Sequence, residues 1–379
     1  MIYLDNAATS YPKPTVVYEA MDNCNRTLAF NVGRGQYDSA SQAASIVERT
    51  RRQILNFFDC PTGQVIFSPS ATSALNMVIQ GQPYQEGDVI YISPFEHNAI
   101  RRTLNHLAQK IKLHIKFLSV SKMPFTFDLE TIKTQFSNDP PAFVFISHAS
   151  NVCGALAPVK ELFLLAKLYG ATTILDTAQS AGHVSISMRD ILADYLIFAG
   201  HKALLGPIGI GGIVMHNKDA NLKPTIFGGT GFDSRNPFMP KELPYRLEAG
   251  SLNIVAIAGL SASLQWISEI GIETIVAHES EMLNRIQMIL DDSGVFSCLG
   301  VNYLGDRVGV LSCISEEYLP DELGLILNKN SICVRTGLHC SPDAHRFFNT
   351  FPSGAIRFSV GIFTSKEDID QLASVIQEM

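Results

Sequence analysis

Lys202 is the residue in this sequence whose setting most favours chemistry. It follows the apolar run 195–198 and precedes an apolar loop, Ala203-Leu-Leu-Gly206. A lysine in such a setting is partly removed from water, which lowers the pKa of its amine and leaves a neutral nucleophile that forms imines with carbonyl groups. The alternative is a lysine whose stem lies along the sheet edge while its amine reaches water.

A nucleotide site at this lysine is excluded by two patterns. The dipeptide His201-Lys202 lacks the Gly-Lys-Ser/Thr ending of a P-loop. The glycines Gly206, Gly209 and Gly211 do not have the spacing of a dinucleotide-binding loop.

Two further apolar runs end in polar residues that suit one ligand. Asp176 follows 173–175 and begins Asp176-Thr-Ala-Gln179. A buried acid is costly without a positive partner, so it either keeps a pyridinium nitrogen protonated or caps the next helix. The run 65–67 leads into Ser-Pro-Ser-Ala-Thr72 and then a helical pattern. Such a helix start binds phosphate through its N–H groups, although an ordinary N-cap is favoured on this stretch alone.

Four other polar residues stand near the ends of apolar runs: His97, Asn151, Ser251 and Arg357. His97 can stack on a planar ring or be structural, and Asn151 can donate to a ring hydroxyl or shape a turn. Arg357 can clamp a substrate carboxylate through two hydrogen bonds or form a surface ion pair. Ser251 follows Glu-Ala-Gly, where a turn is the simple interpretation.

Cys340 is the cysteine with the most reactive setting, in the loop Arg335-Thr-Gly-Leu-His-Cys340. With His339 beside it and Arg335 nearby, we expect a lowered pKa and a nucleophilic thiolate. A metal site of His339, Cys340 and His345 is not favoured, because adjacent residues are poorly spaced as co-ligands and no CxxC or HxxxH completes a tetrahedral set. The cysteines expected to be structural are Cys24, Cys60, Cys153, Cys298, Cys313 and Cys333.

Composition predicts a globular protein with a large core. The 379 residues are 46% hydrophobic and 17% charged, with a formal net charge of −7. Nucleic acid and anionic membrane are therefore not expected as partners. The N-terminus has neither the positive nor the apolar region of a secretory signal, and no apolar stretch approaches the roughly 20 residues that span a bilayer. Seven scattered cysteines favour a reducing cytoplasm.

The elements that must position these residues form an α/β pattern. Apolar strands alternate with helical patterns such as 99–110 and 159–168, which predicts a mostly parallel central sheet flanked by helices. The predicted strands are 65–68, 89–92, 115–118, 143–147, 173–175, 195–198 and 212–215. Ligands of such sheets bind beyond the carboxyl ends of the strands, where the polar residues stand.

Beyond an irregular stretch at 217–246, the pattern changes. Two helices, at 255–270 and 272–292, precede short strands at 308–312, 332–335 and 356–359 and a final helix from residue 365. We therefore expect a smaller α+β C-terminal domain. The predicted division is a large domain of residues 16–255 and a small domain of residues 1–15 and 256–379.

Taken in order, these segments resemble the class V branch of the pyridoxal-phosphate aminotransferase superfamily, and within it the cysteine desulfurases. The resemblance covers essentially the whole chain. Each segment alone is weakly specific, but their joint order is specific because each supplies a different cofactor contact. The segments are Tyr3-Leu-Asp-Asn-Ala-Ala-Thr9, Phe95-Glu-His97, Ser147-His-Ala-Ser-Asn151, Asp176-Thr-Ala-Gln179, Gly200-His-Lys202, Arg246-Leu-Glu-Ala-Gly250, Arg335-Thr-Gly-Leu-His-Cys340 and Arg357-Phe-Ser359.

The resemblance implies fold type I and a covalently held pyridoxal 5'-phosphate. Lys202 is similar to the family's Schiff-base lysine, Asp176 to the partner of the pyridine nitrogen, and His97 to the histidine stacked on the ring. Gln179 and Asn151 resemble the polar contacts near the ring hydroxyl.

The phosphate contacts that the resemblance implies are Ala71, Thr72 and His201. Ser251 matches a residue that reaches the phosphate from a second subunit, which implies a homodimer with shared active sites. No metal is implied.

The resemblance also implies the substrate and the reaction. Arg357 resembles the arginine that binds the substrate carboxylate, with Asn151 as a second substrate contact. Cys340 resembles the sulfur-accepting cysteine, on a short loop typical of the subgroup with a compact catalytic loop. Lys202, Cys340 and His97 are thus the expected catalytic residues. L-cysteine would become L-alanine, and the persulfide on Cys340 would pass its sulfur to an acceptor, such as a second protein.

One position departs from the family pattern. A hydroxyl residue often stands two before the histidine of the lysine motif, and here it is Ala199, which puts one phosphate hydrogen bond in doubt. The alternatives are a selenocysteine lyase, an epimerase or an aminotransferase of the same class, and a non-catalytic subunit of a sulfur-transfer assembly. The presence of Cys340 argues against most of the other class V enzymes. The presence of both Lys202 and Cys340 argues against a non-catalytic subunit.

Overall fold

A seven-stranded sheet forms the centre of the molecule. The structure is a computed structural model that describes residues 1–379 except 33–34 and 36. In spatial order the strands are β2 (Gln64–Ser68), β10 (Gly211–Met215), β9 (Tyr195–Ala199), β8 (Thr172–Asp176), β7 (Phe143–Ser147), β3 (Val89–Ile92) and β4 (His114–Phe117). All seven predicted strands are confirmed, with ends within one residue of the prediction.

The sheet is mostly parallel, as predicted. Only β10 runs against its neighbours, β2 and β9, so the other six strands point the same way. Both faces of the sheet are covered, since alternate residues of one strand enter separate cores: Val144 and Ile146 join one, and Phe143 and Phe145 join the other. Burial on both faces explains why these strands are continuously apolar.

Helices cover the two faces of this sheet. Residues of α3 and α4 pack into one core, and residues of α2, α6 and α8 pack into the other. The helices of this part are α1 (Thr15–Thr27), α2 (Asp38–Phe57), α3 (Ala71–Gly81), α4 (Asn98–Ala108), α5 (Leu129–Asn138), α6 (Val159–Lys167), α7 (Met188–Ile191) and α8 (Ile254–Ile270). The helices predicted at 99–110 and 159–168 correspond to α4 and α6.

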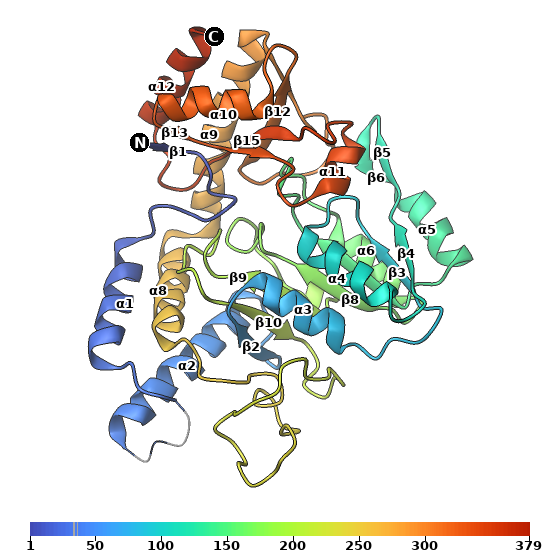
Figure 1. Cartoon of the computed structure of the whole chain (residues 1–379), viewed down its shortest axis with the longest axis vertical. Coiled ribbons are helices and arrows are strands. Elements are labelled where there is room, and N and C mark those ends of the chain that lie inside the picture. The colour runs from blue at the N-terminus through green and yellow to red at the C-terminus, as the bar shows by residue number, and fades with distance from the viewer. Residues whose placement is uncertain (33–34, 36) are drawn as a thin grey trace.

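The C-terminal part is an α+β unit above the large sheet in Figure 1. Its antiparallel strands are, in spatial order, β11 (Phe296–Cys298), β12 (Val310–Ser315), β15 (Ala355–Ser359) and β14 (Arg335–Gly337). Its helices are α9 (Ile272–Ser293), α10 (Pro320–Lys329), α11 (Pro342–Phe347) and α12 (Lys366–Gln377). The strand predicted at 332–335 is two strands, because the chain changes partners there: β13 (Ile332–Cys333) pairs with β1 (Ile2–Tyr3), and β14 pairs with β15.

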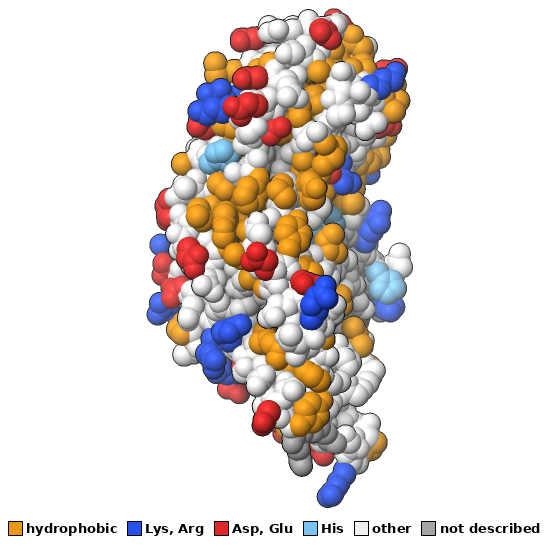
Figure 2. Space-filling view, turned by 90° about the vertical axis from the view of Figure 1, so that its left-hand side faces the viewer, with side chains coloured by type: hydrophobic (Ala, Val, Ile, Leu, Met, Phe, Trp, Pro, Cys, Tyr) orange, Lys and Arg blue, Asp and Glu red, His pale blue; other side chains and the backbone are white. Residues whose placement is uncertain are grey.

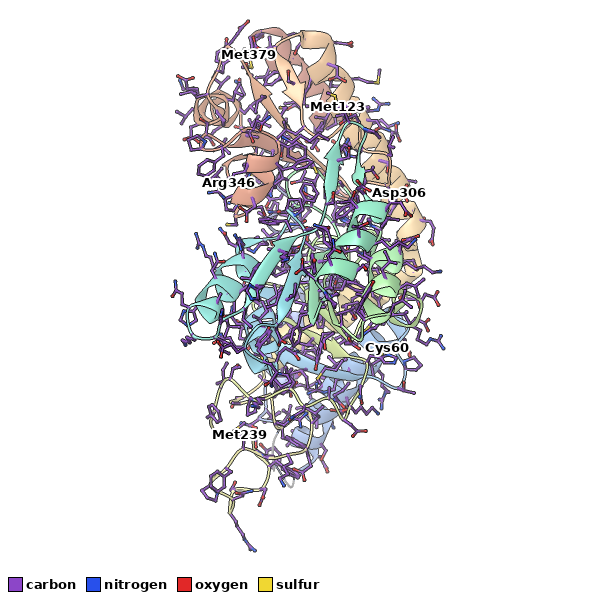
Figure 3. All side chains as sticks on the ribbon, turned by 90° about the vertical axis from the view of Figure 1, so that its right-hand side faces the viewer. Cys60, Met123, Met239, Asp306, Arg346 and Met379 are labelled. Atoms are coloured by element: carbon purple, nitrogen blue, oxygen red, sulfur yellow. The ribbon has the colours of Figure 1, made fainter. Side chains whose placement is uncertain are left out.

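The two parts of the chain are tied together at several places. The N-terminal strand β1 joins the C-terminal part, and α8 packs against α1 and α2 beside the large sheet. The division of the chain at residues 15 and 255 stays a prediction. A hairpin of β5 (Val120–Lys122) and β6 (Phe125–Phe127) carries Met123 toward the C-terminal part, as Figure 3 shows, and Phe125 bridges to Tyr303.

The long segment between β10 and α8 has no helix or strand among its residues, as predicted for 217–246. It forms the loop below the sheet in Figure 1, and Met239 marks it in Figure 3. Of the helices in the described part of the chain, none alone has the length and hydropathy to cross a membrane; α8 and α9 pass that test only as a pair bent by 82°.

Candidate active site

Seven of the eleven predicted site residues line one pocket beyond the carboxyl ends of the strands; the residues that do not line it are His201, Ser251, Cys340 and Arg357. Asp176 and Ser147 end β8 and β7, Lys202 follows β9, and α3 begins just after β2. The space inside the pocket, open solvent included, is about 410 Å³. Its lining residues are Ala71, Thr72, Leu75, His97, Ala99, Ser147, Ala149, Asn151, Asp176, Ala178, Gln179 and Lys202.

Lys202 has the lowered basicity that the sequence predicts. Burial lowers its pKa to about 8, while the negative charge of Asp176 acts in the opposite direction. At neutral pH a substantial fraction of this amine is therefore neutral, which a nucleophile or proton acceptor requires.

The backbone around Lys202 is held by the N-terminal segment. The carbonyl of His201 accepts hydrogen bonds from the Ser10 N–H at 3.0 Å, the Thr9 hydroxyl at 3.0 Å and the Lys13 ammonium at 2.7 Å. The Ser10 hydroxyl also donates to the carbonyl of Lys202 at 3.0 Å. These bonds fix the peptide from which the Lys202 side chain extends.

Asp176 is a buried acid beside this lysine. Burial raises the pKa of its carboxyl, and the Ala178 N–H and the positive charge of Lys202 counteract that rise. The Ala178 N–H donates to Oδ1 at 2.9 Å, but this bond lies in a turn, and the next helix, α7, is capped by Ser187, so the alternative that Asp176 caps a helix is wrong. The carboxylate also lines the pocket, where a cationic group of a ligand would offset its burial.

His97 presents a neutral ring to the pocket. It is the N-cap of α4, and its Nδ1 accepts a hydrogen bond from the Ala99 N–H at 3.0 Å, which leaves the proton on Nε2. Burial, and then the positive charge of Lys202, lower the pKa of His97 to about 4. A neutral, fixed imidazole is suited to stacking on a flat ring.

The start of α3 opens onto the same pocket. Ser70 caps the helix by accepting a hydrogen bond from the Ser73 N–H at 3.1 Å, and Ala71 and Thr72 line the pocket. A Cβ at Gly211 would lie 2.9 Å from the Ala71 nitrogen, so glycine is required for the close approach of β10. The N-cap interpretation is therefore confirmed, whereas phosphate binding by the remaining N–H groups of this helix start stays a prediction.

Two further predicted contacts lie at or near the pocket. Gln179 lines it and donates through Nε2 to the carbonyl of Ala7 at 2.8 Å. His201 is next to Lys202, its Nδ1 is buried without a hydrogen-bond partner in the described part of the chain, and burial lowers its pKa to about 4. A polar ligand group would satisfy that nitrogen.

Asn151 connects the pocket to the Cys340 loop. Its Nδ2 donates to the carbonyl of His339 at 2.6 Å, and its Oδ1 accepts from the Ser341 hydroxyl at 2.7 Å. Cys340 itself is exposed, and its carbonyl accepts from the Asn98 N–H, at the start of α4, at 2.7 Å. The loop with the exposed thiol is therefore fastened to two elements of the pocket.

The prediction that His339 helps to lower the pKa of Cys340 is wrong. Burial lowers the pKa of its imidazole to about 2, with the charge of Arg357 as a second cause. A neutral histidine supplies no positive charge to a neighbouring thiolate. The cations that interact electrostatically with Cys340 include Lys202, Arg335 and Arg357, and two of these three lie far from it along the chain.

Arg357 is buried rather than part of a surface ion pair. It lies in the centre of β15 with 2% of its surface exposed. Its Nη1 donates to the carbonyl of Asn151 at 3.0 Å and its Nη2 to Asp5 Oδ1 at 3.0 Å. Its Nε is buried without a partner in the described structure, so part of the guanidinium is available to a substrate carboxylate.

Ser251 lies outside the pocket. It is exposed, accepts a hydrogen bond from Asn31 Nδ2 at 3.1 Å, and lines a separate hollow with Arg51 and Glu248. Its predicted contact with a second subunit's phosphate site stays a prediction.

Sequence reasoning missed two buried acids that organise the site. Asp5 joins Arg357 to Arg335, and Glu96 accepts hydrogen bonds from the hydroxyls of Ser93 at 2.6 Å and Ser147 at 2.7 Å. Burial raises the pKa of Glu96 to about 7. The available signal was an acid inside each quoted segment, Leu-Asp-Asn and Phe-Glu-His, in otherwise apolar surroundings.

Comparison with known proteins agrees with this geometry. The aminotransferase class-V family model matches residues 2–372. A probable cysteine desulfurase of Halalkalibacterium halodurans is 32% identical over 387 residues, covering 100% of this chain and 93% of that protein. Another of Pyrococcus abyssi is 30% identical, covering 100% of this chain and 94% of that protein.

A solved structure gives the same result. The apo structure of a cysteine desulfurase from Thermococcus onnurineus NA1 superposes with a TM-score of 0.92 at 30% sequence identity, covering 100% of this chain and 94% of that chain. The match extends over both parts of the molecule, as does the family model. The chain therefore belongs to the aminotransferase class-V family and, within it, to the cysteine desulfurases.

Proposed function

We propose that this protein is a pyridoxal-phosphate-dependent enzyme that converts L-cysteine to L-alanine and takes the sulfur onto Cys340. The observation that carries the proposal is one pocket lined by Lys202, Asp176 and the start of α3, with the Cys340 loop bonded to its Asn151.

The residues present fit the cofactor. Lys202 would hold it covalently, Asp176 would pair with its ring nitrogen, and the start of α3 at Ala71 and Thr72 would hold the phosphate together with His201. The unpartnered buried Nδ1 of His201 supports this fit. When bound, pyridoxal phosphate withdraws electrons from the α-carbon of an amino acid.

The substrate would be oriented by its carboxylate. Arg357 offers a buried, permanently charged guanidinium with an unpartnered Nε, and Asn151 is the proposed second substrate contact. Lys202, once released from the cofactor, is the group that would take the proton from the substrate α-carbon. His97, held neutral by burial, would keep the ring in place from one face.

The sulfur transfer balances without an external oxidant. The thiolate of Cys340 attacks the sulfur of the substrate, an S–S bond forms, and the bond between that sulfur and the substrate β-carbon breaks. The electron pair stays on the β-carbon, which gains a proton and becomes the methyl group of alanine. Cys340 is left as a persulfide, whose outer sulfur passes to an acceptor thiol, on a small molecule or a second protein.

We propose in addition that the protein is a homodimer of the cytoplasm. Each of its seven cysteines, all among the described residues, is a free thiol. Exposed hydrophobic side chains on or before α1 include Tyr11, Val16 and Tyr18, and Figure 2 shows hydrophobic side chains gathered on that side of the molecule. Ser251 lies away from the pocket of its own chain, as expected of a residue that serves a partner. Light scattering of the purified protein tests this state.

The function is tested by an alanine assay on L-cysteine with the cofactor-loaded protein. The wild type should form alanine and, without reductant, gain the mass of one sulfur atom on the peptide containing Cys340. Cys340→Ala should bind L-cysteine but release no sulfide in the presence of reductant. Sulfide release by that variant at the wild-type rate would exclude Cys340 as the nucleophile, and no alanine from the wild type would refute the proposal.

A further inference from the structure

The Cys340 loop has an unusual backbone conformation. His339 has φ of 48° and Cys340 has φ of 58°, so two successive residues with side chains lie in the left-handed region. Non-glycine residues rarely adopt this region, and they persist there only where the surroundings hold them. The loop therefore needs an external clamp.

The clamp consists of hydrogen bonds to the flanking residues of the cysteine. The side-chain amide of Asn151 bonds to both neighbours of Cys340. It donates to the His339 carbonyl (2.6 Å) and accepts from the Ser341 hydroxyl (2.7 Å). The carbonyl of Cys340 accepts from the Asn98 N–H at 2.7 Å. The His339 ring packs against the His345 ring, with centroids 5.4 Å apart.

Ser341 is the part of this clamp with no other evident task. It is fully buried, and its hydroxyl is the hydrogen-bond donor that the structure gives to Asn151 Oδ1. Without that hydroxyl, the amide of Asn151 loses the bond that sets which end faces His339. The carbonyl of Asn151 meanwhile accepts from Arg357, so the same residue touches the pocket, the arginine and the loop.

We propose that Ser341 is a positioning residue, which acts through Asn151 to hold the Cys340 thiol where it can reach the sulfur of the substrate. This inference rests on the proposed function, and it deepens it by separating two tasks. Binding of the amino acid would depend chiefly on Arg357 and Lys202, with Asn151 as a lesser contact, whereas transfer of its sulfur would depend in addition on the Ser341–Asn151 hydrogen bond.

The test is Ser341→Ala, with Ser263→Ala as the matched control. Ser263 is equally buried, but its hydroxyl donates to the Leu260 carbonyl of its own helix, α8, at 2.9 Å. In single-turnover experiments with L-cysteine, Ser341→Ala should form the Cys340 persulfide about tenfold more slowly. Its affinity for L-alanine, followed by the cofactor absorbance, should stay within about twofold of that of the wild type and of Ser263→Ala. Persulfide formation at the wild-type rate would overturn the proposal.

Hydrogen exchange provides a second measurement that needs no activity. In the Ser341→Ala variant, the backbone amide hydrogens of the peptide from Arg335 to Phe347 should exchange several-fold faster than in the wild type. In the Ser263→Ala variant, they should exchange at the wild-type rate. Unchanged exchange in Ser341→Ala would refute the clamp even if the wild type made no alanine. Conversely, faster exchange with no alanine from the wild type would leave the clamp standing and refute only the proposed function.

Discussion

Asp5 and Arg357 form a buried ion pair next to the active-site pocket, where Arg357 also donates to the carbonyl of Asn151, a lining residue. Oδ1 of Asp5 lies 3.0 Å from Nη2 of Arg357, and their side chains are only 11% and 3% exposed. The same carboxylate accepts from Arg335, 2.7 Å away at Nη2, which is the cross-strand neighbour of Arg357. One carboxylate therefore pairs with two adjacent guanidinium groups and helps to fix the position of the Arg357 side chain.

Asp5→Asn should weaken both the fold and substrate binding. Removing one partner of a buried ion pair leaves an uncompensated charge, so the free energy of unfolding should fall by on the order of 3 kcal/mol. The KM for L-cysteine should rise about tenfold with a smaller change in kcat, because ground-state binding is lost. Urea unfolding and steady-state kinetics measure the two effects.

The control for this variant is Asp22→Asn. Asp22 pairs with Arg26 on the surface of α1, with side chains 62% and 73% exposed, and such pairs contribute little. That variant should keep the wild-type stability and KM. A wild-type KM for Asp5→Asn would show that Arg357 does not need its acid to bind substrate.

Gly211→Ala should disturb the phosphate end of the pocket. Its new Cβ would lie 2.9 Å from the Ala71 nitrogen and 2.8 Å from the Phe198 carbonyl oxygen, too close for any carbon atom. We expect a loss of about 1–3 kcal/mol in stability and an affinity for pyridoxal phosphate reduced about tenfold, measured by titration of the cofactor-free protein.

Gly228→Ala is the matched control, since its Cβ would meet no atom nearer than 3.8 Å. It should bind the cofactor like the wild type. Equal affinities for Gly211→Ala and Gly228→Ala would place the phosphate elsewhere.

The pH dependence of cofactor uptake should follow Lys202. Only the neutral amine attacks an aldehyde, and burial lowers the pKa of Lys202 from 10.5 to about 8. Below that pKa, the neutral fraction rises about tenfold per pH unit, and above it the fraction is nearly constant. Stopped-flow absorbance of the cofactor-free protein should therefore show a rate that rises up to about pH 8 and then levels off. A rate that keeps rising toward the pKa of free lysine would contradict the burial of this amine.

Much of this site was predictable because it follows local patterns. Lys202 and Asp176 each end an apolar run that becomes a central strand, and parallel strands bring such residues to one edge of the sheet. The partners of these residues were not predictable in the same way. Asp5 meets Arg357 across 352 positions, and Ser341 meets Asn151 across 190. The first contact depends on the N-terminal strand joining the C-terminal part, and the second on how that part meets the large sheet, and no local sequence pattern encodes either.

The error about His339 has a related cause. Sequence adjacency to Cys340 suggested a helpful positive charge, whereas the fold buries that ring and lowers its pKa to about 2. Adjacent residues on a tight loop point in different directions. The positive charges that interact with the thiol come instead from Arg335, as the sequence suggested, and from Lys202 and Arg357 on other elements.

The most direct test of the account is to locate the lysine that carries the cofactor. Borohydride reduction of the loaded protein, followed by peptide mass analysis, fixes the pyridoxyl group to its lysine. Lys13 is a demanding competitor, because burial also lowers its pKa to about 8 and it bonds to the carbonyl of His201. We predict the pyridoxyl mass on Lys202 alone, whereas its appearance on Lys13 or on any other lysine would contradict the account.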